Sequence, residues 1–589
     1  MPQRTHTCGA LRKEDIDQHV TLEGWVMHRR DHGGVIFVDL RDRYGLTQVV
    51  FRPDRHAEAH DLADTLRSEY VIRVSGKVAP RLEGQENPKL ATGDIEVDVE
   101  TLEILNTATP SPFELDEYDT TTGETTRLKF RYLDLRRPRM QRNIITRHRM
   151  WKLIRDYYDA KGFLEIETPF LTKSTPEGAR DFLVPSRIEP GHFYALPQSP
   201  QLFKQMLMAS GFDRYFQIVR CFRDEDTRAN RQAEFVQLDV EMSFVDENDV
   251  IDNSERLLAL LCREILDREI TLPLPRLTYA DAMSRYGCDS PDTRFGVELI
   301  EAGDIAAQSE FKVFKSVVEG GGQVKGVCAP GGAELSRKEI DDLGKVVAEY
   351  GAKGLAWFKV DENGLTSQIA KFFDEALQKQ LIERLAAKPG DLLMFVADKP
   401  SVVAASLAAL RLAVGKRLDL IDESAFNFVW VLDFPLFLWN EDEQRCDSPH
   451  HPFTAPRPED EAMLATEPLK VISRAYDLVL NGTEIAGGSI RIHRPELQQK
   501  VFDLLNISAE EAEQRFGFFV RALSYGTPPH GGIAWGLERT LMLFLGEQSL
   551  REVIPFPKTQ RGQCLLTEAP NDVDARQLHE LGLRLAEES

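Results

Sequence analysis

The segment from Phe222 to Phe244 has the most informative pattern of apolar and polar positions in the chain. Apolar side chains occupy every second position of its second half: Val236, Leu238, Val240, Met242 and Phe244. The alternate positions carry Phe235, Gln237, Asp239 and Glu241. Because strand side chains alternate between two faces, this predicts one apolar face and one face with an aromatic ring and three polar groups. A plain hairpin with one solvated face would have the same pattern, but we expect the polar face to be the floor of a site.

The first hundred residues have the pattern of a small barrel. Five short segments alternate or are rich in β-branched residues, at 20–27, 35–40, 47–51, 70–78 and 95–105. A helical interval lies near residues 56–68, and a proline-containing stretch at 109–112 marks a linker. This arrangement predicts an oligonucleotide-binding (OB) type of β-barrel at the N-terminus.

The remainder of the chain divides into two catalytic segments around an insertion. A helix is predicted over 143–161 and a strand over 163–168, ending at Pro169. Residues 290–424 have glycine clusters and alanine-rich helical stretches, and they contain none of the catalytic-looking sequence of the flanking segments. A glycine-flanked strand then turns into a helix at 532–545. We therefore expect a multidomain α+β protein with boundaries at 1–108, 109–140, 141–289, 290–425 and 426–589.

Composition narrows the class of protein. The 589 residues exceed one ordinary core, and 42% hydrophobic with 28% charged residues is typical of a globular protein. No apolar run could span a bilayer and no secretory signal is present, so we expect a cytoplasmic protein. The seven scattered cysteines fit neither a disulfide framework nor a zinc site. A net charge of −23 argues against indiscriminate nucleic-acid binding but allows local patches.

Three segments resemble the signature motifs of the class II aminoacyl-tRNA synthetases. The predicted helix and strand at 143–168 resemble motif 1, through which these enzymes dimerise, so a homodimer is expected. Arg223 and Glu225, followed by the Arg231-x-x-x-Phe235 spacing, resemble motif 2. Gly536-Leu537-Glu538-Arg539 resembles motif 3. Their order and separation imply an antiparallel-sheet catalytic domain of this class, with an inserted α+β domain between motifs 2 and 3.

Further segments narrow the resemblance to the bacterial-type aspartyl-tRNA synthetases over essentially the whole chain. These segments are Ser174 to Asp181 and Gln198 to Lys204. The resemblance implies activation of L-aspartate with ATP and transfer of aspartate to the terminal adenosine of a tRNA. It places the amino-acid pocket at Glu177, Ser199, Gln201, Lys204, Arg223, Asp239, His450 and Arg491. A buried Lys204 and Arg491 would reject the neutral amide of asparagine.

The same resemblance assigns the nucleotide site. ATP is expected to contact Arg223, Asp224, Glu225, Gln232, Phe235, Glu484, Gly536, Leu537, Glu538 and Arg539. Phe235 would stack on adenine, and Arg223 and Arg539 would bind phosphates. Asp477 and Glu484 would hold magnesium, whose ligands are oxygens. Arg223, Glu225, Glu484 and Arg539 are the expected catalytic residues, and no zinc is expected.

In the barrel, the resemblance implies recognition of the anticodon. Phe37 would stack on a base, with hydrogen bonds from Arg30, Gln48, Arg81 and Glu96. A core position for Phe37 is the structural alternative. His32 and Gly84 match the relaxed type of enzyme that also charges the asparagine tRNA and supplies an amidotransferase.

Other functions remain open from the sequence. One is a synthetase strict for the aspartate tRNA. Another is an inactive RNA-binding paralogue, which would be expected to lose some of Arg223, Glu225, Glu484 and Arg539, all of which are present. An asparagine synthetase on the same fold would usually lack the barrel, and lysine or asparagine specificity fits Lys204 with Arg491 less well.

Overall fold

The computed structural model describes residues 4–116, 121–175, 179–226 and 228–586. The chain forms two compact units, Met1–Asn143 and Ile144–Ser589, and the division falls within helix α4 (Pro138–Asp159). Each unit has its own hydrophobic core. Within the described residues, no helix is both long and apolar enough to cross a membrane.

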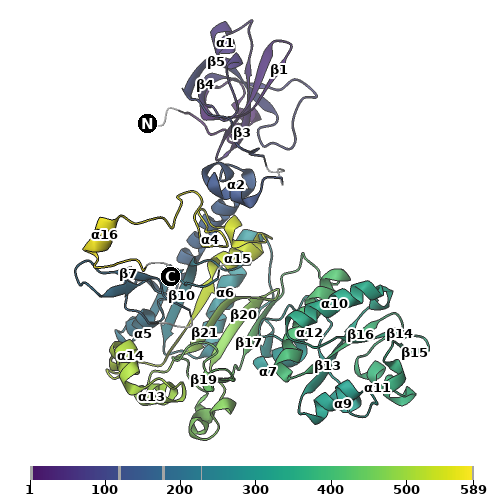
Figure 1. Cartoon of the computed structure of the whole chain (residues 1–589). Helices are drawn as coiled ribbons and strands as arrows, with labels where there is room; N and C mark the ends of the chain where they lie inside the picture. The colour runs from purple at the N-terminus through teal and green to yellow at the C-terminus, as the bar shows by residue number, and fades with distance from the viewer. Residues whose placement is uncertain (1–3, 117–120, 176–178, 227, 587–589) are drawn as a thin grey trace. The chain divides into compact units, whose positions relative to one another are not determined.

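The first unit contains a closed five-stranded barrel, as predicted (Figure 1). Its strands follow the order β1 (His19–His32), β2 (Val35–Asp42), β3 (Gly45–Phe51), β5 (Ile95–Asn106) and β4 (Val71–Pro80). Alternate side chains of β1, such as Val20, Leu22 and Val26, fill the interior. Helix α1 (Ala57–Asp64) follows β3, and α2 (Glu124–Lys129) and α3 (Arg131–Asp134) follow the barrel.

The second unit is built around an eight-stranded sheet (Figure 1). Its strands, in spatial order, are β11 (Arg276–Thr278), β17 (Phe428–Leu432), β20 (Ala475–Leu480), β21 (Thr483–Ile490), β22 (His530–Gly536), β10 (Glu234–Ser243), β9 (Arg214–Phe222) and β6 (Leu164–Glu165). The two outer pairs are parallel and the other pairs are antiparallel. The helices of this region are α4, α5 (Gln201–Ala209), α6 (Glu247–Leu266), α13 (Pro495–Leu504), α14 (Ala509–Leu523) and α15 (Leu537–Phe544).

One face of strand β10 differs from the prediction at its end. Val236, Leu238, Val240 and Met242 pack into the core, as the alternation predicts. Phe244, however, lies beyond the strand, has a φ of 60° and is 71% exposed. The prediction that Phe244 shares the buried face is wrong because the backbone turns after Ser243, and strand alternation then no longer applies.

A separate five-stranded sheet forms between residues 300 and 398. Its order is β12 (Ile300–Glu301), β13 (Gln323–Ala329), β16 (Leu392–Asp398), β14 (Ala356–Asp361) and β15 (Gly364–Thr366). The helices of this part are α8 (Gly303–Ala306), α9 (Lys312–Glu319), α10 (Arg337–Glu349), α11 (Glu375–Arg384) and α12 (Pro400–Arg417), and α7 (Tyr279–Tyr286) precedes it. Two clusters of buried side chains stabilise this part.

Candidate active site and barrel hollow

A row of small residues leaves space above one face of the large sheet. Asp477 lies opposite Gly487, Gly487 opposite Ala534, and Ala534 opposite Asp239. Residues in such register project to the same face of a sheet. The carboxylates of Asp477 and Asp239 therefore stand on one face, and the two residues between them, Gly487 and Ala534, are small.

Glycines are required at this floor because the carboxylates occupy the space above them. A Cβ on Gly532 would lie 1.9 Å from Oε2 of Glu241, which sits opposite it on β10. A Cβ on Gly487 would lie 2.5 Å from Oδ1 of Asp477 and 3.4 Å from Oε1 of Glu484. Contacts below 3 Å force neighbouring atoms to shift. Gly532 thus admits Glu241, and Gly487 keeps the space between Asp477 and Glu484 open.

Four buried charges form the first part of the site. The Lys204 ammonium lies 2.9 Å from Asp239 and 3.4 Å from Glu241, and Nε of Arg491 lies 3.0 Å from Glu241. All four side chains are at most 2% exposed. Ions removed from water in this way require partners. Here two cations and two anions compensate one another before any ligand binds.

Burial and pairing shift the two carboxylates in opposite directions. Burial raises the pKa of Asp239, although the Lys204 ammonium opposes the shift. Burial alone would also raise the pKa of Glu241, but Arg491 and Lys204 outweigh it and lower that pKa. Glu241 was not among the predicted site residues, yet it holds both cations. Its place on the polar face of β10 was the available signal.

Buried polar atoms in this cluster lack partners among the described residues. They are Oδ2 of Asp239 and Nε2 of Gln201. A guanidinium has five N–H groups and an ammonium three. Arg491 uses four of these, toward Glu241, His451 and Ser489, and Lys204 directs two toward Asp239 and Glu241. Oδ2 of Asp239 can therefore accept from a ligand ammonium, and the unused N–H groups of Gln201, Lys204 and Arg491 can donate to ligand carboxylates.

His451 is a second residue that the sequence did not identify. Its Nε2 lies 2.7 Å from Nη1 of Arg491. Since a guanidinium only donates, this nitrogen must accept, so the imidazole is neutral. Burial and the Arg491 charge hold the pKa of His451 well below its usual value, which agrees with that state.

Three guanidinium groups lie near one another in the second part of the site. Burial lowers the pKa of Arg539, and the positive charges of Arg231 and Arg223 lower it further, although Glu484 opposes them. Nη1 of Arg539 donates to the carbonyl of Glu484 at 2.7 Å. The Arg223 guanidinium lies 5.0 Å from the centre of the Phe235 ring, and Arg231 lies 3.3 Å from Glu225. Clustered like charges next to an aromatic face suit a nucleotide polyphosphate.

The carboxylates of Asp477 and Glu484 border the arginine cluster. Burial and the Asp477 charge raise the pKa of Glu484. Nε2 of His450 lies 3.3 Å from Oδ1 of Asp477. Burial opposes protonation of His450, but Asp477 and Glu484 outweigh it and raise its pKa. Two carboxylates facing the space kept open by Gly487 fit a hard divalent cation that also binds phosphate oxygens. The described residues contain no group of three potential metal ligands.

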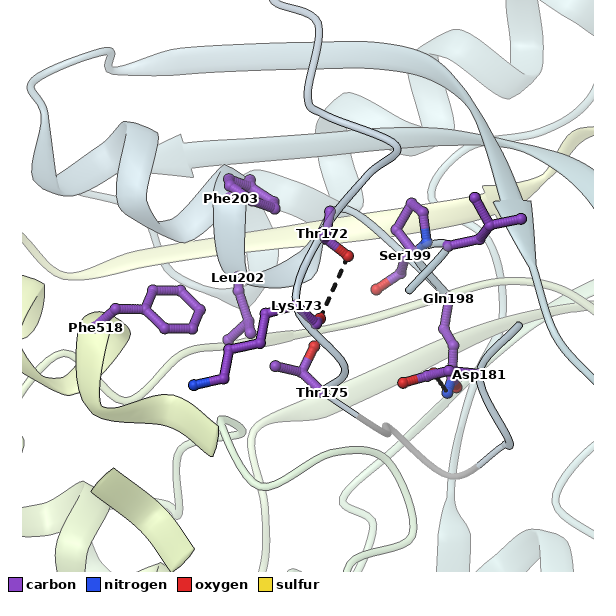
Figure 2. A pocket seen from close by; sticks show the side chains of 11 residues that line it. Thr172, Lys173, Thr175, Asp181, Gln198, Ser199, Leu202, Phe203 and Phe518 are labelled. Carbon is purple, nitrogen blue, oxygen red and sulfur yellow. Dashed lines mark hydrogen bonds between the residues drawn. The ribbon is translucent and has the colours of Figure 1, made fainter. Parts of the chain in front are cut away.

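Ser199 lines a small hollow (Figure 2). The hollow lies between Thr172, Asp181 and the start of α5, and Phe518 of α14 borders it. Oγ of Ser199 accepts the backbone N–H of Gln201 at 3.2 Å. Glu177, the predicted ligand of the substrate ammonium, lies outside the described residues.

The other predicted ATP residues have different surroundings. Asp224 is exposed, and its backbone N–H donates to the carbonyl of Arg180. The Gln232 amide is buried against the backbone of Lys558. Gly536 ends β22, and the side chain of Leu537 is part of the core. Glu538 is only 3% exposed and its carboxylate contacts protein groups.

Most of the predicted anticodon residues surround one hollow in the barrel. It is lined by Arg30, His32, Phe37, Gln48 and Arg81. Phe37 is half-buried and is not part of the barrel core. Glu96 lies behind this group, where it accepts from Gln48 at 2.9 Å. Gly84 is exposed, with a φ of 80°.

Two contacts shape that hollow. The His32 and Phe37 rings meet edge to face, with centroids 6.0 Å apart. Burial lowers the pKa of Arg81, although Glu96 and Asp39 oppose the shift. Asp39, which the sequence did not indicate, accepts from Arg30 at 2.8 Å. An aromatic ring beside polar groups with unused hydrogen-bonding edges suits unstacked bases.

Comparison with known families matches both units. Residues 123–560 match the family described as tRNA synthetases class II (D, K and N), and residues 20–105 match the OB-fold nucleic acid binding domain. A protein of Desulfatibacillum aliphaticivorans named aspartate–tRNA(Asp/Asn) ligase is 56% identical, covering 99% of this chain and 98% of its own. A protein of the same name from Aquifex aeolicus is 55% identical, covering 99% of both chains.

Solved structures have the same fold. Asparaginyl-tRNA synthetase from Pyrococcus horikoshii, complexed with asparaginyl-adenylate, aligns over 95% of this chain and 99% of its own with a TM-score of 0.58 and 18% identity. A putative aspartyl-tRNA synthetase from Leishmania major aligns over 95% and 94% with a TM-score of 0.58 and 20% identity.

Proposed function

The chain belongs to the class II tRNA synthetases (D, K and N), and from this premise we propose that it is an aspartate–tRNA ligase. It would join L-aspartate to ATP, forming aspartyl-adenylate and pyrophosphate, and then transfer aspartate to the terminal adenosine of a tRNA. The buried charge cluster of Lys204, Asp239, Glu241 and Arg491 carries this proposal.

The unused groups of the cluster match an aspartate molecule. The unpartnered Oδ2 of Asp239 would accept the substrate ammonium. The remaining N–H groups of Lys204 and Arg491 would bind the side-chain carboxylate, because the others are already engaged. Glu177 would add a second acceptor for the ammonium, and Ser199, Gln201 and His450 would complete the pocket.

The same arrangement of donors and acceptors excludes asparagine. Its amide nitrogen would place N–H donors against the N–H donors of Lys204 and Arg491, which are buried. Sites that leave buried polar groups unpaired reject such analogues by roughly 10⁴-fold or more. Lysine would place a third cation beside two others. The geometry therefore favours aspartate within this family.

The reaction requires the α-carboxylate of aspartate to be held in line with the α-phosphate of ATP. The substrate α-carboxylate is ionised at pH 7, so its attack on the α-phosphorus of ATP needs no base. Arg223 would stabilise the charge that develops on the α-phosphate, and Arg539 would hold the departing pyrophosphate. Phe235, with Glu225 beside it, would fix the adenine. A hydroxyl of the terminal adenosine then attacks the carbonyl carbon of the mixed anhydride, which forms an ester with the tRNA and releases AMP.

Asp477 and Glu484 would hold magnesium through their oxygens. Bound there, the ion would neutralise phosphate charge next to the arginine cluster. Gly487 leaves the required space, as its missing Cβ indicates.

Pyrophosphate exchange tests the proposal directly. Purified protein should incorporate labelled pyrophosphate into ATP when aspartate is present, without any tRNA. Asparagine and lysine should give at most a background signal. Exchange that depends equally on asparagine would rule out the proposed aspartate specificity. No exchange with any amino acid would rule out the activity itself and would favour an RNA-binding paralogue.

We propose that both the aspartate and asparagine tRNAs are substrates, and that the second product feeds an amidotransferase. The support is His32, whose ring borders Phe37 in the barrel hollow, together with the exposed Gly84. Aminoacylation of pure transcripts of each tRNA, compared with His32→Leu, tests this. The parent should charge both, and the variant should retain only the aspartate tRNA. A parent that charges only the aspartate tRNA would be the strict type.

We also propose a homodimer formed through α4, β6 and the segment that follows them. Ile145, Leu164, Phe170 and Leu171 are each roughly half exposed there, and such apolar surface favours a protein partner. Sedimentation should give twice the mass of one chain, and Leu171→Glu should shift it toward the monomer.

A further inference from the structure

Glu538 lies directly before Arg539, and its carboxylate is bound by two protein donors. Its Oε2 accepts the backbone N–H of Val236 at 2.7 Å. Its Oε1 accepts from Nη2 of Arg147 at 2.8 Å. The side chain is 3% exposed, so both bonds are shielded from water. Each oxygen of this carboxylate is therefore held by one protein donor.

The contact with Val236 replaces a missing strand. Strand β22 pairs with β10 from His530 to Gly536, where Gly536 lies opposite Gln237. The next residue of the chain begins helix α15, so no strand continues alongside Val236. The carboxylate of Glu538 takes the N–H that a further ladder residue would have taken. It thereby joins the first turn of α15 to β10 one residue after Phe235.

Arg147 joins the same carboxylate to helix α4. Its Nη1 donates to the carbonyl of Val553 at 3.2 Å, and its guanidinium lies 4.4 Å from the centre of the Trp151 ring. The guanidinium is therefore held by three groups: the Glu538 carboxylate, the Val553 carbonyl and the Trp151 ring. Burial raises the pKa of Glu538, whereas Arg147 opposes the shift, so the arginine favours the ionised form of the carboxylate.

We propose that Glu538 is a positioning residue that sets the distance between Phe235 and Arg539, and that Arg147 holds it in place from α4. Phe235 and Arg539 are the proposed contacts for the two ends of ATP. An altered Glu538 contact would change the fit of ATP while leaving the aspartate cluster, which is held by its own ion pairs, intact. The inference rests on the proposed function.

The experiment compares Glu538→Gln, Arg147→Met and the double variant in aspartate-dependent exchange. Glutamine keeps the shape and can accept from Val236, but its amide N–H groups then face the donors of Arg147. Losing a charged buried hydrogen bond should lower kcat/KM for ATP about 10- to 100-fold. The KM for aspartate should stay within about twofold. Because the two residues act as one unit, the double variant should lose no more than the worse single variant.

Arg149→Met is the matched control. Arg149 also lies on α4 and pairs with a glutamate, Glu264, but at an exposed position. It should leave both KM values unchanged. An equal rise in both KM values for Glu538→Gln, or additive losses in the double variant, would overturn the inference. If Glu538→Gln does not fold, Arg147→Met alone tests the inference. Its KM for ATP should then rise while its KM for aspartate stays within about twofold of the parent value. Absence of exchange in the unaltered protein would instead refute the proposed function.

Discussion

The two halves of the catalytic floor organise charge in opposite ways. Around Lys204 and Arg491, the cations are buried and paired with Asp239 and Glu241. Around Arg223 and Arg539, the guanidiniums are partly exposed and close to each other. One half is neutral before a ligand arrives, whereas in the other the guanidiniums of Arg223, Arg231 and Arg539 repel one another, although Glu484 opposes that repulsion.

The difference teaches how each half obtains its selectivity. A paired, buried cluster has fixed donors and acceptors, so it discriminates between side chains that differ by one group. An open cluster of guanidiniums attracts any polyphosphate, and the repulsion between its like charges is relieved when that ligand binds. The first half should therefore couple recognition to folding stability, whereas the second should not.

The largest effect should come from Arg491→Leu. Glu241 would lose its main partner inside the protein, and the substrate carboxylate would lose a donor. We expect kcat/KM for aspartate to fall by about 10³-fold or more, and unfolding free energy to fall by about 3–5 kcal/mol. Exchange kinetics and urea unfolding measure the two quantities.

Arg494→Leu controls for the loss of an arginine nearby. Arg494 pairs with Glu461 at the surface, so its removal should change stability by less than about 1 kcal/mol. An unchanged dependence of exchange on aspartate in Arg491→Leu would refute the role assigned to Arg491.

Arg539→Met should separate activity from stability. The residue is partly exposed and donates to one backbone carbonyl, that of Glu484. Without the guanidinium, pyrophosphate loses a fixed counter-charge, so exchange should fall by about 10²-fold. Unfolding free energy should fall by only about 1 kcal/mol, since one hydrogen bond is lost. A stability loss as large as that of Arg491→Leu would erase the contrast between the two halves.

The fold was predictable where local pattern determines it. The alternation at residues 20–27 and 35–40 predicted β1 and β2 because one face of each strand fills the barrel. Phe244 was not predictable in the same way, because the backbone turns at a residue whose type does not indicate a positive φ. Alternation describes a strand but not the residue at which it ends.

The site was predictable where residue type and motif spacing carry the chemistry. Arg223, Phe235 and Arg539 are brought together as the motifs imply. Glu241 and His451 were missed because their partners, Lys204 and Arg491, are distant in the sequence and only the packing of the folded chain brings them close. The direction of the Glu538 side chain depends on where β22 ends, which residue type does not determine.

Gly487→Ala should weaken magnesium binding at Asp477 and Glu484 without affecting the aspartate pocket. The added methyl group would lie 2.5 Å from Oδ1 of Asp477 and displace the carboxylates proposed to hold magnesium. We expect the magnesium concentration for half-maximal exchange to rise about 10-fold, because changes that disturb the orientation of metal ligands typically weaken metal binding by that amount or more. The KM for aspartate should not change. Gly344→Ala, at a position with nothing within 4 Å of the new Cβ, is the control.

The smallest effect should be the pH dependence that His450 introduces. Asp477 and Glu484 raise its pKa despite burial, so the folded protein favours the protonated ring. A protonated His450 competes with magnesium for Asp477, since both are positive. As pH falls through that raised pKa, the KM for magnesium-ATP should therefore rise several-fold, and as pH rises it should fall. Exchange measured between pH 6 and 9 should show this slope, and His450→Gln should flatten it. An equal slope in both proteins would mean that another group titrates, and the proton competition would then belong to Glu484, whose pKa is also raised.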